Sequence, residues 1–263
     1  MAKFCPLFSS SSGNSVYIGS GAGGILIDTG VSCSRLVKAL NDISVMPESI
    51  RAVFLTHEHS DHVAGLDVFT GKYGIPVFSS GGTLMSLNGL RNLTRGQITS
   101  AINEDGVELE DMRVVPFRTS HDVSEPFGYR IELSDGRAIA VMTDTGYVSS
   151  HMLSSVTGCD LVYIESNHDV DMLRTGQYPY VLKQRILSEK GHLSNDACAD
   201  ALCALVNKGT TRIVLAHLSE HNNTPSIAYN TSEAALRLMG ARRGADYLLN
   251  VASPENREGV TVF

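Results

Sequence analysis

Short apolar runs alternate with stretches of helical periodicity along most of the chain. Runs rich in β-branched residues predict strands at 15–19, 24–28, 51–55, 76–78, 112–117, 127–133, 137–143, 160–165 and 211–216, and weaker strands near 246–250 and 259–263. Apolar positions three and four residues apart predict helices at 32–42, 61–73, 82–89, 149–155, 179–189, 195–207 and 225–239. Serines suited to N-caps begin three of these helices, at Ser32, Ser60 and Ser194. This alternation predicts an α/β fold whose helices cover the outer faces of sheets.

The length of 263 residues suffices for one large domain or two small ones. No linker or charge block divides the chain, and "SSSSGN" at 9–14 is its one low-complexity stretch, so we expect a single domain over 1–263. The apolar runs have the length of strands and are broken by Gly, Asp or Ser, which argues against a membrane span. The first residues lack the long apolar region of a secretory signal.

Cysteine usage and charge narrow the class of protein further. Five scattered cysteines without a Cys-x-x-Cys pair indicate reduced thiols in a cytoplasmic protein, not a disulfide framework or a thiolate zinc site. The formal net charge of −7 argues against a protein that coats nucleic acid through bulk electrostatics. A local basic groove stays possible, and bound divalent ions would add positive charge at one spot. The sequence makes no prediction about the oligomeric state.

The tripeptide Asp-Thr-Gly ends an apolar run twice, in "ILIDTG" at 25–30 and in "VMTDTG" at 141–146. Two such tripeptides suggest the paired carboxylates of an aspartic protease, here Asp28 and Asp144. However, Val31 and Tyr147 stand where a protease usually has Ser or Thr after the tripeptide. The protease hypothesis also gives no purpose to the histidines of the next motif, so we reject it.

The stretch "FLTHEHSDHVAG" at 54–65 gathers four residues of metal-ligand type after a predicted strand: His57, His59, Asp61 and His62. A spacing of two along an extended loop puts His57 and His59 on the same side of the chain. Imidazole suits zinc, iron and manganese, and carboxylate oxygen suits harder ions. A polar loop that is rich in histidine by chance would rarely gather four ligand types in six residues, so we predict a metal centre here.

The pattern His-x-His-x-Asp-His after a strand resembles the signature of the metallo-β-lactamase superfamily of hydrolases. Further pieces of that superfamily's pattern are matched in order by Asp28, by His121 in "TSHD", by Asp144 in "TDTG" and by His217 in "VLAHLS". The resemblance implies the metallo-β-lactamase fold, an αββα four-layer sandwich with metals held at one edge by the loops that follow the strands.

The same resemblance implies two divalent metal ions, which could be zinc, manganese or iron. It assigns one ion to His57, His59 and His121, and the second to Asp61, His62 and His217, with Asp144 as the bridging carboxylate. Asp28 would lie buried behind the ligands and orient a loop or a ligand histidine. The second ligand is a true His, not the Glu of flavodiiron relatives, which favours hydrolysis over redox chemistry.

The segment "ESNHDVDMLRTGQYPYVLKQRILSEKGHLSNDA" at 165–197 resembles the YycJ (WalJ) family, whose members are described as 5′–3′ exonucleases and are related to ribonuclease Z and the phosphonate-pathway phosphodiesterase. By this likeness His192, at a helix start, would contact the scissile phosphate and protonate the leaving oxygen. His168 and the ligand Asp61 are the other candidate catalytic residues. A histidine at a helix start can equally cap or pack, and His168 can equally be a hydrogen-bonded loop residue.

Candidate substrate-binding residues are Ser12 and Asn14, in the Ser/Gly-rich stretch, and Ser194, which begins the helix after His192. The Ser/Gly-rich stretch can equally be a turn between strands. Residues 172–192 also favour a phosphate backbone, because they contain Arg174, Lys183, Arg185 and Lys190 against a single acid, Glu189. Half of any such helical run is ordinary solvated surface, however.

Together these features predict a dinuclear metal-dependent phosphodiesterase, and most specifically a 5′–3′ exonuclease that acts on DNA rather than RNA. Two alternatives stay open. A thioesterase or lactonase of the glyoxalase II type shares every metal ligand but leaves the segment at 165–197 unexplained. A nucleic-acid-binding repair protein would use its metal site structurally. Structural sites usually have four ligands and no open position, whereas this sequence offers seven ligands.

Overall fold

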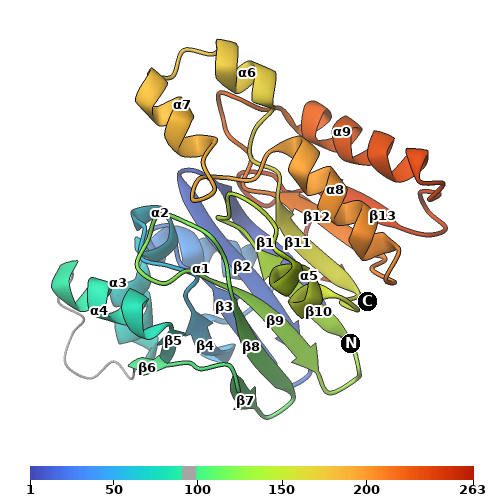
Figure 1. Ribbon diagram of the computed structural model, residues 1–263. Coiled ribbons are helices and arrows are strands. Elements are labelled where there is room, and N and C mark those ends of the chain that lie inside the picture. The colour runs from blue at the N-terminus through green and yellow to red at the C-terminus, as the bar shows by residue number, and fades with distance from the viewer. Residues whose placement is uncertain (91–98) are drawn as a thin grey trace.

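A computed structural model of the chain describes residues 1–90 and 99–263 and shows two sheets face to face with helices outside both (Figure 1). Across the first sheet the order is β14 (Thr261–Val262), β1 (Lys3–Ser10), β2 (Gly13–Ser20), β3 (Gly23–Ile27), β4 (Ile50–Phe54), β5 (Val77–Ser79) and β6 (Thr99–Ala101). Strands β3 to β6 run parallel, whereas β14, β1, β2 and β3 pair antiparallel.

The second sheet has the same mixed character. Its order is β13 (Leu248–Val251), β12 (Arg212–Ala216), β11 (Leu161–Glu165), β10 (Ala138–Met142), β9 (Phe127–Leu133), β8 (Met112–Arg118) and β7 (Val107–Leu109). Strands β10 to β13 run parallel, and β7 to β10 pair antiparallel. Each sheet therefore has a parallel half, in which the carboxyl ends of neighbouring strands share one edge.

Helices cover the outer face of each sheet. The first sheet packs on α1 (Cys33–Asp42), α3 (Leu66–Tyr73) and α4 (Gly81–Leu90), and the second on α5 (Ser150–Val156), α8 (Asn195–Val206) and α9 (Pro225–Leu238). The short helices η1 (Pro47–Ser49) and α2 (Ser60–Val63) lie in connections. Helices α6 (Val170–Thr175) and α7 (Tyr180–Ile186) project beyond the sheets at one end of the molecule (Figure 1).

The main core lies between the two sheets. Alternate residues of the inner strands point into it, as the period of a strand requires, and aromatic rings meet across the interface. Phe54 of the first sheet and Tyr129 of the second have ring centroids 5.7 Å apart, and so do Phe4 and Tyr163. Two further cores fill the space between each sheet and its helices. The predicted αββα sandwich is confirmed.

Several local predictions were wrong. The predicted helix 61–73 is two helices, α2 and α3, because Gly65 packs so tightly that a Cβ there would lie 2.2 Å from the carbonyl oxygen of Val31. The N-cap is His59, not Ser60. Strands β1, β6 and β7 and helix α6 were not predicted. The Ser/Gly-rich stretch is the end of β1, a two-residue turn and the start of β2.

Two other findings bear on the environment of the chain. Each of the five cysteines is a free thiol. Within the described ranges 1–90 and 99–263, no helix combines the length and the apolar character that crossing a bilayer requires.

Candidate metal centre

The predicted ligands meet where the parallel strands of both sheets end. Asp28 follows β3, His57 lies beyond β4, Asp144 follows β10 and His217 follows β12. Asp28, Asp144 and His217 have φ angles of 62°, 57° and 53°, in a left-handed region that costs a non-glycine residue roughly 1–3 kcal/mol. Such strain persists only where the surroundings impose it, and these turns aim buried polar side chains at one place.

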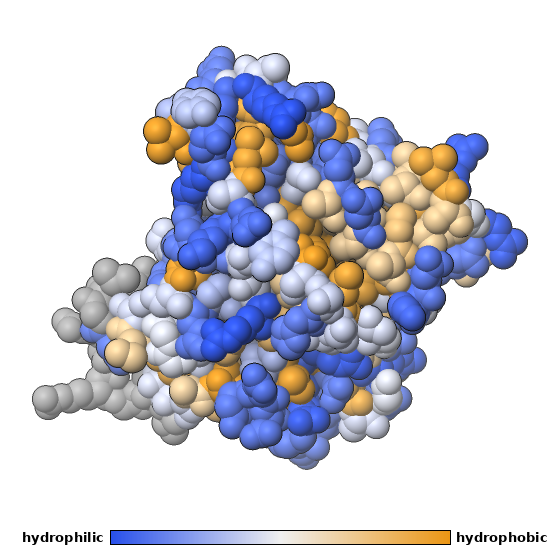
Figure 2. Space-filling view, in the orientation of Figure 1, coloured by the Kyte–Doolittle hydropathy of each residue, from blue (hydrophilic) through white to orange (hydrophobic). Residues whose placement is uncertain are grey.

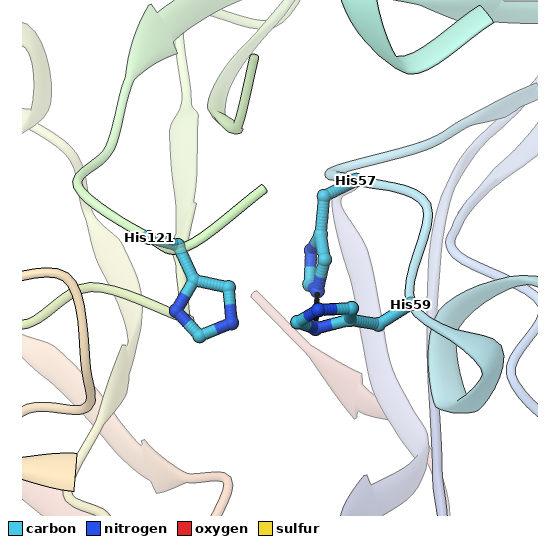
Figure 3. Close-up of side chains that lie close together, drawn as sticks. All are labelled: His57, His59 and His121. Atoms are coloured by element: carbon cyan, nitrogen blue, oxygen red, sulfur yellow. Dashed lines mark hydrogen bonds between the residues drawn. The ribbon is translucent and has the colours of Figure 1, made fainter. Parts of the chain in front are cut away.

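The first group of ligand atoms comes from His57, His59 and His121, which face one another across two loops (Figure 3). Nε2 of His57 lies 3.1 Å from Nδ1 of His59. Nδ1 of His121 donates to the Gly191 carbonyl at 3.0 Å, which leaves its buried Nε2 without a hydrogen-bond partner. Burial lowers the pKa of all three imidazoles, so each presents the neutral form that binds metals.

The second group surrounds Asp144. Its Oδ2 lies 3.5 Å from Nε2 of His62 and 3.5 Å from Nδ1 of His217, and Nε2 of His62 lies 3.4 Å from Oδ2 of Asp61. Neither Oδ2 of Asp144 nor Nδ1 of His217 has a hydrogen-bond partner, although both are buried. Unpaired buried polar atoms are costly unless a cation satisfies them, so this donor set fits a metal ion.

The electrostatics of the cluster also favour a cation. Burial opposes the charge on Asp144, but His217, His62 and the other imidazoles hold the pKa of this carboxyl well below its usual range. Burial likewise opposes a charge on His62, yet Asp144, Asp28 and Asp61 raise the pKa of this imidazole well above its usual value. Three carboxylates around one imidazole leave an excess of negative charge that a bound divalent ion would neutralise.

Asp28 and Asn14 lie behind the ligands. The carboxylate of Asp28 accepts from the backbone N–H and the hydroxyl of Thr56, both at 2.8 Å, and lies 2.8 Å from Nδ1 of His62. Nδ2 of Asn14 lies 3.2 Å from Oδ2 of Asp61 and 3.1 Å from Nε2 of His62. Asn14 is buried, so its position suits support of the ligands better than contact with a substrate.

Ser12 and Ser194, the other candidate substrate-binding residues, lie apart. Ser12 is exposed in the turn between β1 and β2, where its backbone N–H donates to the hydroxyl of Ser10. Ser194 is the N-cap of α8, as predicted, and its hydroxyl accepts from the backbone N–H of Ala197 at 3.2 Å. The hydroxyl of Ser194 is therefore already engaged in capping the start of the helix.

His192 and Glu165 form a hydrogen-bonded ion pair that the sequence did not predict. Nδ1 of His192 lies 2.7 Å from Oε1 of Glu165 and 3.8 Å from Oδ1 of Asp144. Oε2 of Glu165 accepts from the backbone N–H groups of Thr145 at 3.0 Å and Leu193 at 3.2 Å. Burial would lower the pKa of His192, but the charge and hydrogen bond of Glu165 raise it to about 9. A carboxylate that ends an apolar strand, as in "LVYIE", is the sequence signal that could have found Glu165.

His168 is buried in the connection after β11, with neither ring nitrogen hydrogen-bonded to the described residues. Its backbone carbonyl accepts from Asn195 at 2.9 Å, which ties this connection to the start of α8. Burial lowers the pKa of its imidazole to about 4. His168 belongs to none of the three groups of possible metal ligands found in the described residues. These groups are His57, His59 and His121; His57, His62 and Asp144; and Asp144, Glu165, His192 and His217.

Comparison with known proteins shows the family of this chain. Residues 24–218 match the model of the β-lactamase superfamily domain. The chain is 36% identical over 264 residues to "Exodeoxyribonuclease WalJ" of Streptococcus pneumoniae serotype 2, with 98% of this chain and 97% of the relative covered. It is 34% identical over 253 residues to "Exodeoxyribonuclease YycJ" of Bacillus anthracis, with 96% of each covered.

A solved structure agrees on the fold. The metallo-β-lactamase fold protein YhfI from Bacillus subtilis superposes with a TM-score of 0.74 at 17% identity, with both chains fully covered. The metallo-β-lactamase fold predicted above is thereby confirmed, and with it a cluster that binds divalent metal ions. This chain belongs to the β-lactamase superfamily and, within it, to the family of WalJ and YycJ.

Proposed function

We propose that this protein is a metal-dependent exodeoxyribonuclease that hydrolyses phosphodiester bonds of DNA from a 5′ end. Two near-full-length relatives that bear the name exodeoxyribonuclease support the substrate class. The pairing of His192 with Glu165 beside Asp144 supports the reaction, because it puts a potential proton donor at the edge of the metal cluster. Within the structure, this pair is the observation that carries the phosphodiesterase assignment.

The cluster suits two divalent ions, and Asp144 would be a ligand of both. His57, His59 and His121 would hold one ion, and Asp61, His62 and His217 the other. When bound, such ions activate water as a nucleophile and neutralise charge on phosphate oxygens. Imidazole-rich ligation with carboxylates is compatible with zinc, manganese or iron.

The residues around the cluster orient the reaction. Asp28 fixes His62 by its 2.8 Å contact with Nδ1, which leaves Nε2 as the nitrogen that faces the cluster. Glu165 engages Nδ1 of His192 and stabilises the protonated imidazole, so Nε2 is left to give a proton to the leaving oxygen. His168, whose ring nitrogens are unpaired, is the second candidate for contact with the substrate.

Degradation of 5′-labelled single- and double-stranded DNA and RNA, each in zinc and in manganese, tests the proposal. We expect release of labelled mononucleotides or short oligonucleotides from DNA, dependent on added metal and abolished by a chelator. The same preparation is assayed on bis-p-nitrophenyl phosphate and on a thioester. Thioester hydrolysis without cleavage of either diester would overturn the assignment in favour of a glyoxalase II-type activity.

A further inference from the structure

The lobe formed by α6 and α7 projects beyond the sheets (Figure 1), and its surface is largely hydrophilic and broken by apolar patches (Figure 2). The four cations of residues 172–192 have different environments. Nζ of Lys183 donates to the carbonyls of Arg174 and Gly176, at 2.8 and 2.6 Å, and so supports the lobe itself. The side chains of Arg174 and Lys190 are exposed. Arg185 alone reaches toward the metal centre.

Arg185 forms an ion pair with Asp122, which follows the ligand His121 in the sequence. Its Nε and Nη2 donate to Oδ2 and Oδ1 of Asp122, at 2.5 and 2.9 Å, in a bidentate pair. The same Oδ1 lies 3.5 Å from Nε2 of His121, the unpaired nitrogen that faces the metal cluster. The carboxylate of Asp122 therefore lies between the guanidinium of Arg185 and Nε2 of His121. Arg185 thus lies just outside the group of predicted ligands.

The position of Arg185 is fixed by the segment that leads to His192. The Ile186 carbonyl accepts from the backbone N–H of His192 at 3.0 Å, and the Glu189 carbonyl accepts from the Ser120 hydroxyl at 2.8 Å. Gly146 packs against this segment so closely that a Cβ would lie 2.3 Å from the Glu189 carbonyl oxygen. Arg185 is thus held relative to both the proton donor and the ligand loop.

The chemistry of this pair suits a phosphate. The side chain of Arg185 is 44% exposed and that of Asp122 is 32% exposed, so water and a substrate can reach both. A guanidinium binds phosphate oxygens in the same forked geometry as a carboxylate. If the scissile phosphate of a polynucleotide binds at the metal cluster, its neighbouring phosphate would lie outside the group of ligands, and Arg185 lies there, one carboxylate away from His121.

We propose that Arg185 binds the backbone phosphate adjacent to the scissile bond, and that the carboxylate of Asp122 only occupies the guanidinium until that phosphate replaces it. The inference rests on the proposed nuclease function and adds a determinant of polynucleotide recognition to it. A substrate with a single phosphate makes no such contact. Arg185 therefore matters for DNA and not for a small diester.

Variants of the two partners separate this role from a structural one. Loss of one charge-assisted phosphate contact in Arg185→Ala should raise KM for DNA roughly tenfold, with kcat within about threefold of wild type, and should lower the slope of log KM against log salt by about one. Rates on bis-p-nitrophenyl phosphate should not change. Arg185→Lys should be intermediate, because an ammonium lacks the fork. In Asp122→Asn the guanidinium is no longer neutralised, so KM for DNA should stay equal or fall.

The matched control is Arg137→Ala. Arg137 forms a similarly exposed pair with Asp135, at 2.8 Å, in the turn between β9 and β10, and its loss should leave KM for DNA and the salt slope unchanged. All rates are compared at saturating metal. An Asp122→Asn protein with the same rise in KM as Arg185→Ala would show a purely structural pair and overturn the inference. So would an Arg185→Ala protein with unchanged KM and salt slope, or with equal losses on both substrates. If the wild-type protein hydrolyses neither diester, the proposed function fails instead.

Discussion

The two Asp-Thr-Gly turns, at 28–30 and 144–146, share a sequence and a backbone conformation but differ in what surrounds them. Asp28 and Asp144 each follow a central strand of one sheet, with φ angles of 62° and 57°, and both are buried. The carboxylate of Asp28 is fully engaged by Thr56 and His62. Oδ2 of Asp144 has no hydrogen-bond partner and faces His62 and His217 at 3.5 Å.

The imidazole of His62 stands between the two carboxylates. Its Nδ1 lies 2.8 Å from Asp28 and its Nε2 lies 3.5 Å from Asp144. The two aspartates therefore do not form the proton-sharing pair of an aspartic protease, which needs direct contact between carboxyl groups. In our proposal, one carboxylate orients a ligand and the other is available to a cation.

The rest of each tripeptide supports a different part of the centre. A Cβ on Gly30 would lie 1.6 Å from the carbonyl oxygen of Asp61, in the ligand loop, whereas one on Gly146 would meet Glu189, just before His192. The backbone N–H of Thr145 donates to Glu165, the partner of His192. The tripeptide thus specifies a turn with close backbone contact, and its neighbours decide whether that turn supports the loop of His57 to His62 or the pair of Glu165 and His192.

The largest effect is expected at Asp144. Replacement by Ala removes the carboxylate that we propose both ions share, so we expect no detectable hydrolysis of DNA or of bis-p-nitrophenyl phosphate at any metal concentration. Circular dichroism should show a folded protein, because the sandwich core does not depend on this side chain. Hydrolysis within tenfold of wild type would contradict a central role for Asp144.

His192 comes next and tests the second turn's role in supporting a proton donor. General acid catalysis is typically worth roughly 10²–10⁴-fold, so His192→Ala should lose about that factor on DNA, whose alkoxide leaves poorly without a proton. The loss on bis-p-nitrophenyl phosphate should be much smaller, because nitrophenolate leaves unaided. Equal losses on both substrates would make His192 a positioning residue and direct the search for the acid to His168.

Asp28 should give a smaller and mixed effect. In Asp28→Ala the buried Thr56 and His62 groups lose their acceptor, which should lower the free energy of unfolding by about 1–3 kcal/mol. Metal affinity and rate should fall roughly 10–100-fold, as expected when a residue that orients a ligand is lost. Chemical denaturation and steady-state rates measure the two effects. A variant of full stability without any activity would instead indicate direct participation in catalysis.

The two glycines offer the smallest contrast. Gly30→Ala and Gly146→Ala should each cost about 1–3 kcal/mol of stability, because a Cβ would collide with backbone in both places. Their kinetic effects should differ: Gly30→Ala should weaken metal binding, and Gly146→Ala should lower the rate on DNA more than on bis-p-nitrophenyl phosphate. Indistinguishable kinetics of the two variants would contradict the different functions that we assign to the two turns.

The layered fold was predictable because its central strands, such as β11 and β12, are uninterrupted apolar runs that end in polar residues. Strand β1 was not, because Pro6 and the serines after Phe8 interrupt its alternation. The break between α2 and α3 depends on the packing of Gly65 against Val31, a residue distant in the sequence. Such tertiary contacts leave no periodic signal in the chain.

The ligand cluster was readable for a different reason, since four ligand types stand within six residues and the others match a known pattern. Glu165 escaped notice because its one signal, a carboxylate at the end of the apolar run "LVYIE", has no characteristic spacing to His192. The burial of Asn14 beneath Asp61 and His62 likewise arises from the pairing of β1 with β2 and the approach of α2. Which polar residues face a substrate and which support ligands is decided by such long-range contacts.

The most direct test of the central claim is the metal content of three proteins: wild type, Asp28→Ala and Asp144→Ala. Each is reconstituted with excess metal, unbound ions are removed, and the bound metal is measured by elemental analysis. If Asp144 bridges two ions and Asp28 only orients a ligand, wild type should bind close to two ions per chain. Asp28→Ala should approach that value when metal is saturating, and Asp144→Ala should hold well under two. Two ions retained by Asp144→Ala would contradict the bridging role and with it the different functions assigned to the two turns.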